Sequence, residues 1–262
     1  MNYIVLDLEF NQPFPFKSGK QTILNPECPF EIIQIGAVKL NESFQTLDSF
    51  NFLIKPQIYN RIHPFVEKIT GITLEQIKNC PPFPDAYHSF IDFIGEEKSV
   101  LCTWGIDDIK SLYRNILYYN LNISSIPDQY INVQSFATSY LNYEQGKTIG
   151  LKNAVTELNL EIQADFHNAL NDADYTAKIF KIVHPEELKI ETFNLLDLTK
   201  KKIYKGRIHI KALLQYFEKS LNRSLTLEET NLIKESYRLG RNQVFDIPSE
   251  KFKIIKNKGE KK

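Results

Sequence analysis

Apolar residues fill the start of the chain, but two acidic residues interrupt them at alternate positions. Within YIVLDLEF, Asp7 and Glu9 are the only charged residues. Because successive side chains of a strand point to opposite faces, this pair shares one face. The apolar residues of the other face are Ile4, Leu6, Leu8 and Phe10. Neighbouring carboxylates in an apolar strand repel each other and resist burial, so the pattern predicts a strand that carries a specialised polar site.

Strand-like and helix-like patterns then alternate up to about residue 200. Further strands are predicted at EIIQIGAVKL, SFNFLIKP and SVLCTW. Apolar residues recur at helical spacing over 85–94, 109–117 and 151–158, and again after residue 167. A short helix is predicted to open at Thr73, where Gln76 completes a capping-box pattern. Strands that come first and alternate with helices later predict an α/β fold with a mixed sheet flanked by helices.

The pattern changes after about residue 200. Helical spacing appears in HIKALLQYFEKSL and in TLEETNLIKESYRLG, which opens with a capping-box pattern, while KKIYKGRIHI is predicted as a strand or an extended linker. Apolar side chains at helical spacings indicate that most of this segment is folded and docked: Leu213, Leu214, Phe217, Leu232, Ile233 and Tyr237.

A formal net charge of zero hides an asymmetry between these two parts. Residues 1–200 contain 16 Lys/Arg and 25 Asp/Glu, a charge of −9, whereas residues 201–262 contain 16 and 7, a charge of +9. The end, KFKIIKNKGEKK, is almost entirely basic among its charged residues. One interpretation is a solvated, partly disordered tail, and the other is a contact with a polyanion.

Length and composition fit a soluble globular enzyme. The 262 residues suffice for one sizeable core and at most a small second unit. Three cysteines without a CxxC pair argue for a reducing compartment, and against a disulfide framework or a zinc site. We see neither a signal peptide nor an apolar run long enough to span a bilayer, so we expect no membrane association and a cytoplasmic location.

Three further candidate site residues lie at or near the ends of predicted strands and helices. Asp108 stands where the strand SVLCTW gives way to a helix, and its neighbour Asp107 competes for the same role, since one of the two is expected to cap the helix. His167 is expected on the turn before the last helix of the α/β part. Asp172 heads an apolar stripe on that helix, which predicts that its carboxylate faces the sheet. Small residues at 169, 173 and 177 would permit a close approach of the helix.

These groups together suit phosphoryl chemistry. Four carboxylates could hold two divalent cations, and His167 is the natural general base because an unperturbed histidine has a pKa near about 6.5. Taken singly, each motif is weak: a lone D-x-E is usually a solvated edge, and a tryptophan such as Trp104 is more often core than a stacking platform. Asp174 and the other histidines are expected to be ordinary surface or core residues.

The same residues resemble the motifs of the DEDDh 3′–5′ exonucleases of the ribonuclease H-like superfamily. DLEF resembles the first motif and HNALNDA the third, while TWGIDDIKSL resembles the second in a register that favours Asp108 over Asp107. The similarity is greatest to the KapD and Eri-1-like branch. It covers about residues 1–184, which leaves 185–200 as a linker and 201–262 as a basic, mostly helical extension that resembles nothing familiar.

Membership of this family would imply a ribonuclease H-like mixed sheet and two Mg²⁺ or Mn²⁺ ions bound by Asp7, Glu9, Asp108 and Asp172. The implied activity is the release of nucleoside monophosphates from 3′ ends of single strands or short 3′ overhangs. RNA is mildly favoured as the substrate, from the branch alone. The alternatives are a DNA-trimming or proofreading exonuclease, and a regulatory nucleic-acid-binding protein with incidental nuclease activity, against which the complete ligand set argues.

Substrate contacts are predicted at three further positions, Phe10, Trp104 and Asn168. Asn168 stands where many relatives carry arginine, a departure that would weaken a phosphate contact and leave the ligand set intact.

Deletion of residues 201–262 tests the role of the basic extension. If the extension grips the substrate backbone upstream of the 3′ end, its loss should weaken binding of long single strands and flatten the salt dependence of binding, by roughly 0.7 in logarithmic slope per lost contact. Very short oligonucleotides should be turned over as before. A truncated protein with an unchanged salt slope and an altered oligomeric state would instead identify a self-association or partner-docking element.

Overall fold

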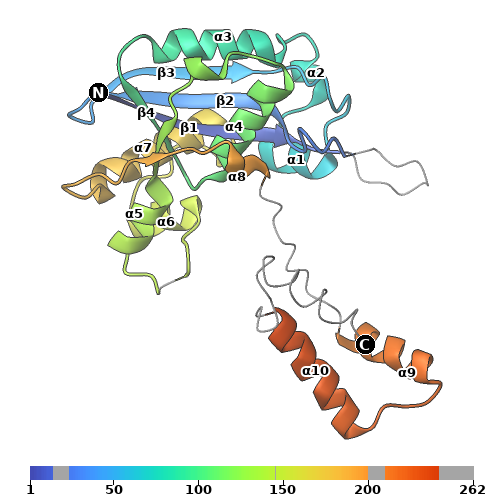
Figure 1. Ribbon diagram of the computed structural model, residues 1–262. Helices are drawn as coiled ribbons and strands as arrows, with labels where there is room; N and C mark the ends of the chain where they lie inside the picture. Colours follow the sequence, from blue (N-terminus) through green and yellow to red (C-terminus); the bar gives the residue numbers. More distant parts are fainter. Residues whose placement is uncertain (14–23, 145, 200–209, 242–262) are drawn as a thin grey trace, which may run out of the picture. The chain divides into compact units, whose positions relative to one another are not determined.

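The computed structural model describes residues 1–13, 24–144, 146–199 and 210–241, and the chain divides into two compact units, 1–200 and 201–262. The first unit is built on a six-stranded sheet in the order β3-β2-β1-β4-β5-β6 (Figure 1). The strands are β1 (Asn2–Asn11), β2 (Glu31–Leu40), β3 (Thr46–Leu53), β4 (Ser99–Thr103), β5 (Gln129–Asn132) and β6 (Glu191–Thr192). Pairs β1–β4 and β4–β5 are parallel and the other pairs are antiparallel, which confirms the predicted mixed sheet.

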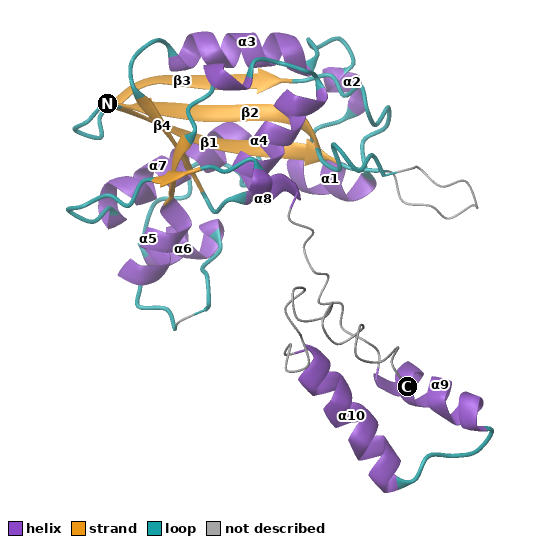
Figure 2. Cartoon of the chain, in the orientation of Figure 1, coloured by secondary structure: helices purple, strands orange, loops and turns teal. Residues whose placement is uncertain are grey.

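Helices cover the sheet on both faces (Figure 2). They are α1 (Pro64–Thr70), α2 (Leu74–Ile77), α3 (Phe83–Ile94), α4 (Asp107–Tyr118), α5 (Val133–Tyr140), α6 (Leu151–Glu157), α7 (Ala169–Val183) and α8 (Leu196–Thr199), with a 3₁₀ turn at Ile123–Ser125. The predicted helices correspond to α2, α3, α4, α6 and α7, and α2 has the expected capping box between Thr73 and Gln76. Every helix in the described ranges is too short or too polar to span a bilayer.

The two faces of β1 belong to two different cores. Its even-numbered apolar residues pack with α3 and α4, whereas Tyr3 and Val5 pack with α5, α6 and α7. A strand buried on both faces carries apolar residues almost continuously, as β1 does. Asp7 and Glu9 continue the face of Tyr3 and Val5, and are therefore carried toward α7.

Gly36 allows the first turn of α7 to lie directly against the sheet. This residue pairs with Asp7 across β1 and β2, and a Cβ atom built on it would lie 2.1 Å from the backbone carbon of Ala169. Glycine inside a strand weakens the strand, but it permits such a close approach of another backbone. Gln34 lies two residues before Gly36 on β2 and is 1% exposed. Its Oε1 accepts the N–H of Ala169 at 3.2 Å, and this hydrogen bond fixes the contact.

A polar clamp holds the segment between β3 and α1 against the ends of β1 and β2. The buried Glu31 carboxylate accepts backbone N–H groups of Gln57, Ile58 and Tyr59 at 2.5–2.9 Å. Asn11, its partner across the strands, accepts the N–H of His63 at 3.0 Å and donates to the carbonyls of Tyr59 and Arg61. Burial raises the pKa of Glu31, and the hydrogen bonds from these backbone groups and from Tyr119 oppose that rise.

The second unit contains α9 (Ile210–Leu221) and α10 (Leu227–Arg241). The expected capping box at the start of α10 is present, since Thr226 and Glu229 exchange hydrogen bonds of 2.9 and 3.2 Å. Arg223 binds the same glutamate through its two terminal guanidinium nitrogens, at 2.8 and 2.6 Å. No residue of α9 is buried, so docking of its apolar residues stays a prediction. Most of KKIYKGRIHI and the basic end lie outside the described residues.

Replacement of Gly36 by alanine should destabilise the protein through the α7 contact. The added methyl group would meet backbone rather than a flexible side chain, so relief requires α7 to move, and overpacking of this kind typically costs about 1–3 kcal/mol. Chemical denaturation of the variant would measure the loss. Gly150→Ala is a suitable control, because nothing lies near its Cβ position and only the weaker N-cap preference of alanine applies. Equally small losses in the free energy of unfolding for both variants would contradict the close contact.

Candidate metal centre

Four carboxylates from three elements converge where β1 and β4 end. Asp7 and Glu9 lie on β1, Asp108 lies in the first turn of α4 directly after β4, and Asp172 lies in the first turn of α7. Each of Asp7, Glu9 and Asp108 is close enough to other carboxylates of the group for their charges to raise its pKa. The structure therefore brings together the four acidic residues expected from the sequence.

Burial and mutual repulsion favour the protonated forms of these acids. Glu9 is 7% exposed, and burial, followed by the charges of Asp172 and Asp108, raises its pKa to about 8. Burial first, then the charge of Asp107, raises the pKa of Asp108 to about 7, although backbone N–H groups including that of Leu8 donate to it and oppose the rise. The pKa of Asp7 is raised well above its usual range by burial and by all three neighbouring carboxylates.

The two carboxylate oxygens of Asp172 have different surroundings. Oδ2 accepts the backbone N–H of His167 at 3.0 Å. Oδ1 is buried and has no hydrogen-bond partner among the described residues, and neither has the hydroxyl of Thr176, one turn further along α7. A buried carboxylate oxygen without a partner is costly unless a cation or water binds it. Burial raises the pKa of Asp172, and both the hydrogen bond from His167 and the charge of its ring oppose the rise.

His167 lies on the turn before α7, as expected, with its side chain exposed. Its φ of 64° is in the left-handed region, which is uncommon for residues other than glycine and often marks a functional turn. One ring nitrogen lies with one oxygen each of Glu9 and Asp172 in a cluster whose atoms are all within 4.8 Å of one another. The histidine is thus at the edge of the acidic group rather than inside it.

The two neighbouring aspartates are clearly separated in the structure. Asp108 is 9% exposed and belongs to the acidic group. Asp107 is on the surface, with 80% of its side chain exposed and the Lys110 ammonium 3.9 Å away. The expectation that one of the two caps α4 is wrong, because the N-cap is Ile106, which has no side-chain oxygen, and both aspartates lie inside the first turn.

The three predicted substrate contacts are only partly free to serve that role. Phe10 is half-buried at the end of β1, with its ring 6.3 Å from that of Phe30. Trp104 packs against the core, and its indole N–H donates to the carbonyl of Ile149 at 3.2 Å. Asn168 is the N-cap of α7, since its Oδ1 accepts two backbone N–H groups of the first turn. Substrate contact by these residues stays a prediction.

Sequence reasoning missed the two residues that place α7. Gln34 pairs with Glu9, and Gly36 pairs with Asp7, so both stand beside the acidic strand in β2. Signals were present: a polar residue inside the apolar run EIIQIGAV, and a glycine in a strand interior, which commonly marks a close backbone approach.

The donor set fits divalent cations. Carboxylate oxygens are the ligands that hard cations such as Mg²⁺ and Mn²⁺ prefer, and a bound cation would satisfy the orphaned Oδ1 of Asp172. Its positive charge would also offset the burial and the neighbouring negative charges that raise the pKa values of Glu9 and Asp108. Glu9, His167 and Asp172 already bring ligand atoms within 4.8 Å of one another, and Asp7 and Asp108 are the other carboxylates of the group that could hold such ions.

Comparison with known proteins connects this geometry to nucleases. A family model described as Exonuclease (RNase_T) matches residues 4–180. The chain is similar to the probable 3′-5′ exonuclease KapD of Bacillus subtilis, with 26% identity over 190 residues that cover 72% of this chain and 87% of that protein. It is also similar to 3′-5′ exoribonuclease 1 of Homo sapiens, with 24% identity over 59% of this chain and 46% of the human protein.

The fold has solved counterparts. The nuclease domain of 3′hExo, a DEDDh family member bound to rAMP, superimposes with a TM-score of 0.60 and 22% identity, covering 73% of this chain and 97% of that domain. At this identity the likeness concerns the fold, and it confirms the expected ribonuclease H-like arrangement.

Without divalent cations, the free energy of unfolding should fall as the pH rises from about 5 to about 8. The folded protein retains protons on Glu9 and Asp108 that the unfolded chain has already released, because their pKa values are raised to about 8 and about 7. The neutral acids therefore contribute stability that is complete below their ordinary pKa values and is lost as the pH passes the raised ones.

Thermal unfolding in EDTA across this pH range measures the effect, and added Mg²⁺ or Mn²⁺ should restore stability at the upper end. Glu9→Gln should flatten the profile, whereas replacement of the exposed Glu96 by glutamine should not. If the stability of the metal-free wild type does not decline as the pH rises, the pKa values of these acids are not raised in the folded protein.

Proposed function

We propose a mechanism and a substrate for this chain, on the premise that it belongs to the exonuclease family whose model matches residues 4–180 and is a 3′–5′ exonuclease of the DEDDh type. It removes nucleoside monophosphates from the 3′ ends of single-stranded nucleic acid or short 3′ overhangs. The observation that carries the proposal is the convergence of four carboxylates, one with an orphaned buried oxygen, beside an exposed histidine.

Two divalent cations are the proposed cofactors, held by Asp7, Glu9, Asp108 and Asp172. When bound, such ions supply an activated water and offset negative charge on the leaving 3′ oxygen. The chain's own contribution is to hold the four carboxylates in fixed positions: two on one strand, one at the start of α4, and one on a helix pressed against Gly36. Both Mg²⁺ and Mn²⁺ suit this oxygen-rich set.

His167 is the proposed general base. Its ring is exposed and lies at the edge of the carboxylate group, where it can take a proton from an attacking water without being buried itself. The hydrogen bond from its backbone N–H to Asp172 fixes the turn that carries it. Its ring nitrogen is also close enough to Glu9 and Asp172 to serve as a metal ligand, and the experiment below separates the two roles.

RNA is the preferred substrate in this proposal, because the human relative is named as an exoribonuclease and the 3′hExo domain is bound to rAMP. DNA is the alternative, and the discriminating assay compares end-labelled RNA and DNA single strands of matched sequence. A cytoplasmic location also stays a prediction.

Asp108→Asn should abolish hydrolysis of an end-labelled single strand, and Asp107→Asn should leave it nearly intact. The first change removes a buried member of the acidic group, whereas the second alters an exposed side chain near the start of α4, where the helix dipole contribution is about 0.3–1 kcal/mol of stability. Wild-type hydrolysis should need Mg²⁺ or Mn²⁺ and stop in chelator. Hydrolysis that persists in chelator would refute the metal-dependent mechanism, and the reverse mutational pattern would move the ligand to Asp107.

His167→Ala should lower single-turnover rates by about 10²–10⁴-fold, the usual contribution of a positioned base, with little change in the metal concentration needed for half-maximal rate. A rate restored by excess metal would identify His167 as a ligand instead. An unchanged rate would leave it only a structural role.

A further inference from the structure

An open cavity of about 640 Å³ lies beside His167, walled by parts of three helices. It is lined by the end of α1 with Gly71, by the start of α6, and by the segment from Ile162 to Asn171 that leads into α7. Its volume is within the range of about 300–1,000 Å³ that is typical of small-ligand sites. None of the four ligand carboxylates lines it, so it is distinct from the metal centre but shares His167 as a border.

The cavity carries a surplus of positive charge in a unit whose net charge is −9. Lys68 and Lys152 both line it and are exposed, and within the described part of the chain neither ammonium has an ion-pair partner. The acidic residue in the lining is Asp165, which is exposed. Two unpaired cations against one carboxylate favour an anionic ligand.

Apolar surface accompanies these charges. The half-buried Phe166 ring stacks on Tyr175 with centroids 4.9 Å apart, and the Lys152 ammonium lies 5.8 Å from the Phe166 centroid. Ile162, 52% exposed, adds a second apolar wall. A hydrophobic surface next to ammonium groups matches the two chemical parts of a nucleotide, since bases pack on apolar or aromatic faces and phosphates bind cations.

We propose that this cavity receives a nucleotide on the 5′ side of the scissile bond, with its phosphate bound by Lys68 and Lys152. The inference rests on the proposed function. A strand cut at its last linkage has its scissile phosphate at the metal centre, and its terminal nucleotide carries no other phosphate within the chain. Any second phosphate contact near His167 must therefore come from upstream nucleotides.

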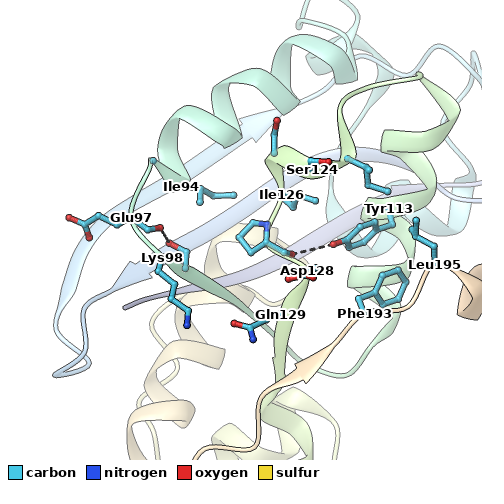
Figure 3. A pocket seen from close by; sticks show the side chains of 15 residues that line it. Ile94, Glu97, Lys98, Tyr113, Ser124, Ile126, Asp128, Gln129, Phe193 and Leu195 are labelled. Atoms are coloured by element: carbon cyan, nitrogen blue, oxygen red, sulfur yellow. Dashed lines mark hydrogen bonds between the residues drawn. The ribbon is translucent and has the colours of Figure 1, made fainter.

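A second cavity, of about 670 Å³, shows that volume alone does not indicate such a role. It lies at the opposite ends of the parallel strands, where Ser99 opens β4 and Gln129 opens β5, and Figure 3 shows Lys98 at its border. Neither His167 nor any of the four ligand carboxylates lines it. Lys98 is therefore a matched control: an exposed lysine beside a cavity of similar size, far from the acidic ends of the strands.

The experiment measures KM of the full chain for single-stranded oligonucleotides, starting from a dinucleotide and adding one nucleotide at a time at the 5′ end. A dinucleotide without a terminal phosphate contains only the scissile phosphate. In the wild type, KM should fall at the length where the strand reaches the cavity, and this fall should be absent from the double variant Lys68→Ala, Lys152→Ala. The double Lys→Arg variant should retain it, because the charge is kept, and Lys98→Ala should behave as wild type.

Salt gives an independent readout. Two lost phosphate contacts should flatten the logarithmic salt slope for longer strands by about 1.4, so the rise of KM between about 50 and 200 mM salt should be about sevenfold smaller in the double alanine variant. Asp165→Asn should lower KM for the longer strands, since it removes the opposing charge. Circular dichroism would verify that each variant is folded.

A folded double alanine variant with wild-type KM at every length and a wild-type salt slope would overturn the inference and leave the exonuclease proposal standing. A wild type that hydrolyses no strand with either metal would overturn the proposed function itself.

Discussion

Repulsion among four enclosed carboxylates is the constraint on which this molecule depends. The sheet supplies two of them from a single strand, so their separation cannot relax without unfolding β1. The third comes from the first turn of α4 and the fourth from a helix held against β2 at Gly36. A fold that encloses these groups without a cation stores unfavourable electrostatic energy, first from burial and then from neighbouring negative charges, and this raises the pKa values of Glu9 and Asp108. Binding of a cation by these carboxylates would release that energy, so affinity for the ion and electrostatic strain in the free protein would have a common origin.

Much of this arrangement could be predicted from local patterns. Long segments with a sustained apolar pattern, nearly continuous in β1 and β2 and helically spaced in α3 and α7, produce signals over ten or more residues. β5 and β6 have four and two residues, too few for any period to appear, and they are defined only by their pairing with neighbours. α5 follows β5 without an intervening loop, so the change from strand to helix is marked only by its N-cap, Asn132.

The candidate site, like the fold, could be predicted from the sequence only in part. Acidic residues in apolar surroundings could be recognised because their burial conflicts with their charge. The error at the start of α4 arose because an apolar residue, Ile106, occupies the N-cap, and capping rules identify only polar caps. Gln34, Gly36, Glu31 and Asn11 act through contacts between distant parts of the chain, and such contacts cannot be read from spacing along one segment.

Asp172 ties two functions to one side chain. One oxygen fixes the turn of His167, and the other is available to a cation. A substitution at this position would therefore disturb the proposed proton acceptor and the proposed ion-binding group simultaneously, whereas a change at Asp7 would touch only the latter. Kinetic defects of Asp172 variants cannot be divided into separate contributions by single replacements, and double-mutant cycles with His167 are the natural way to dissect them.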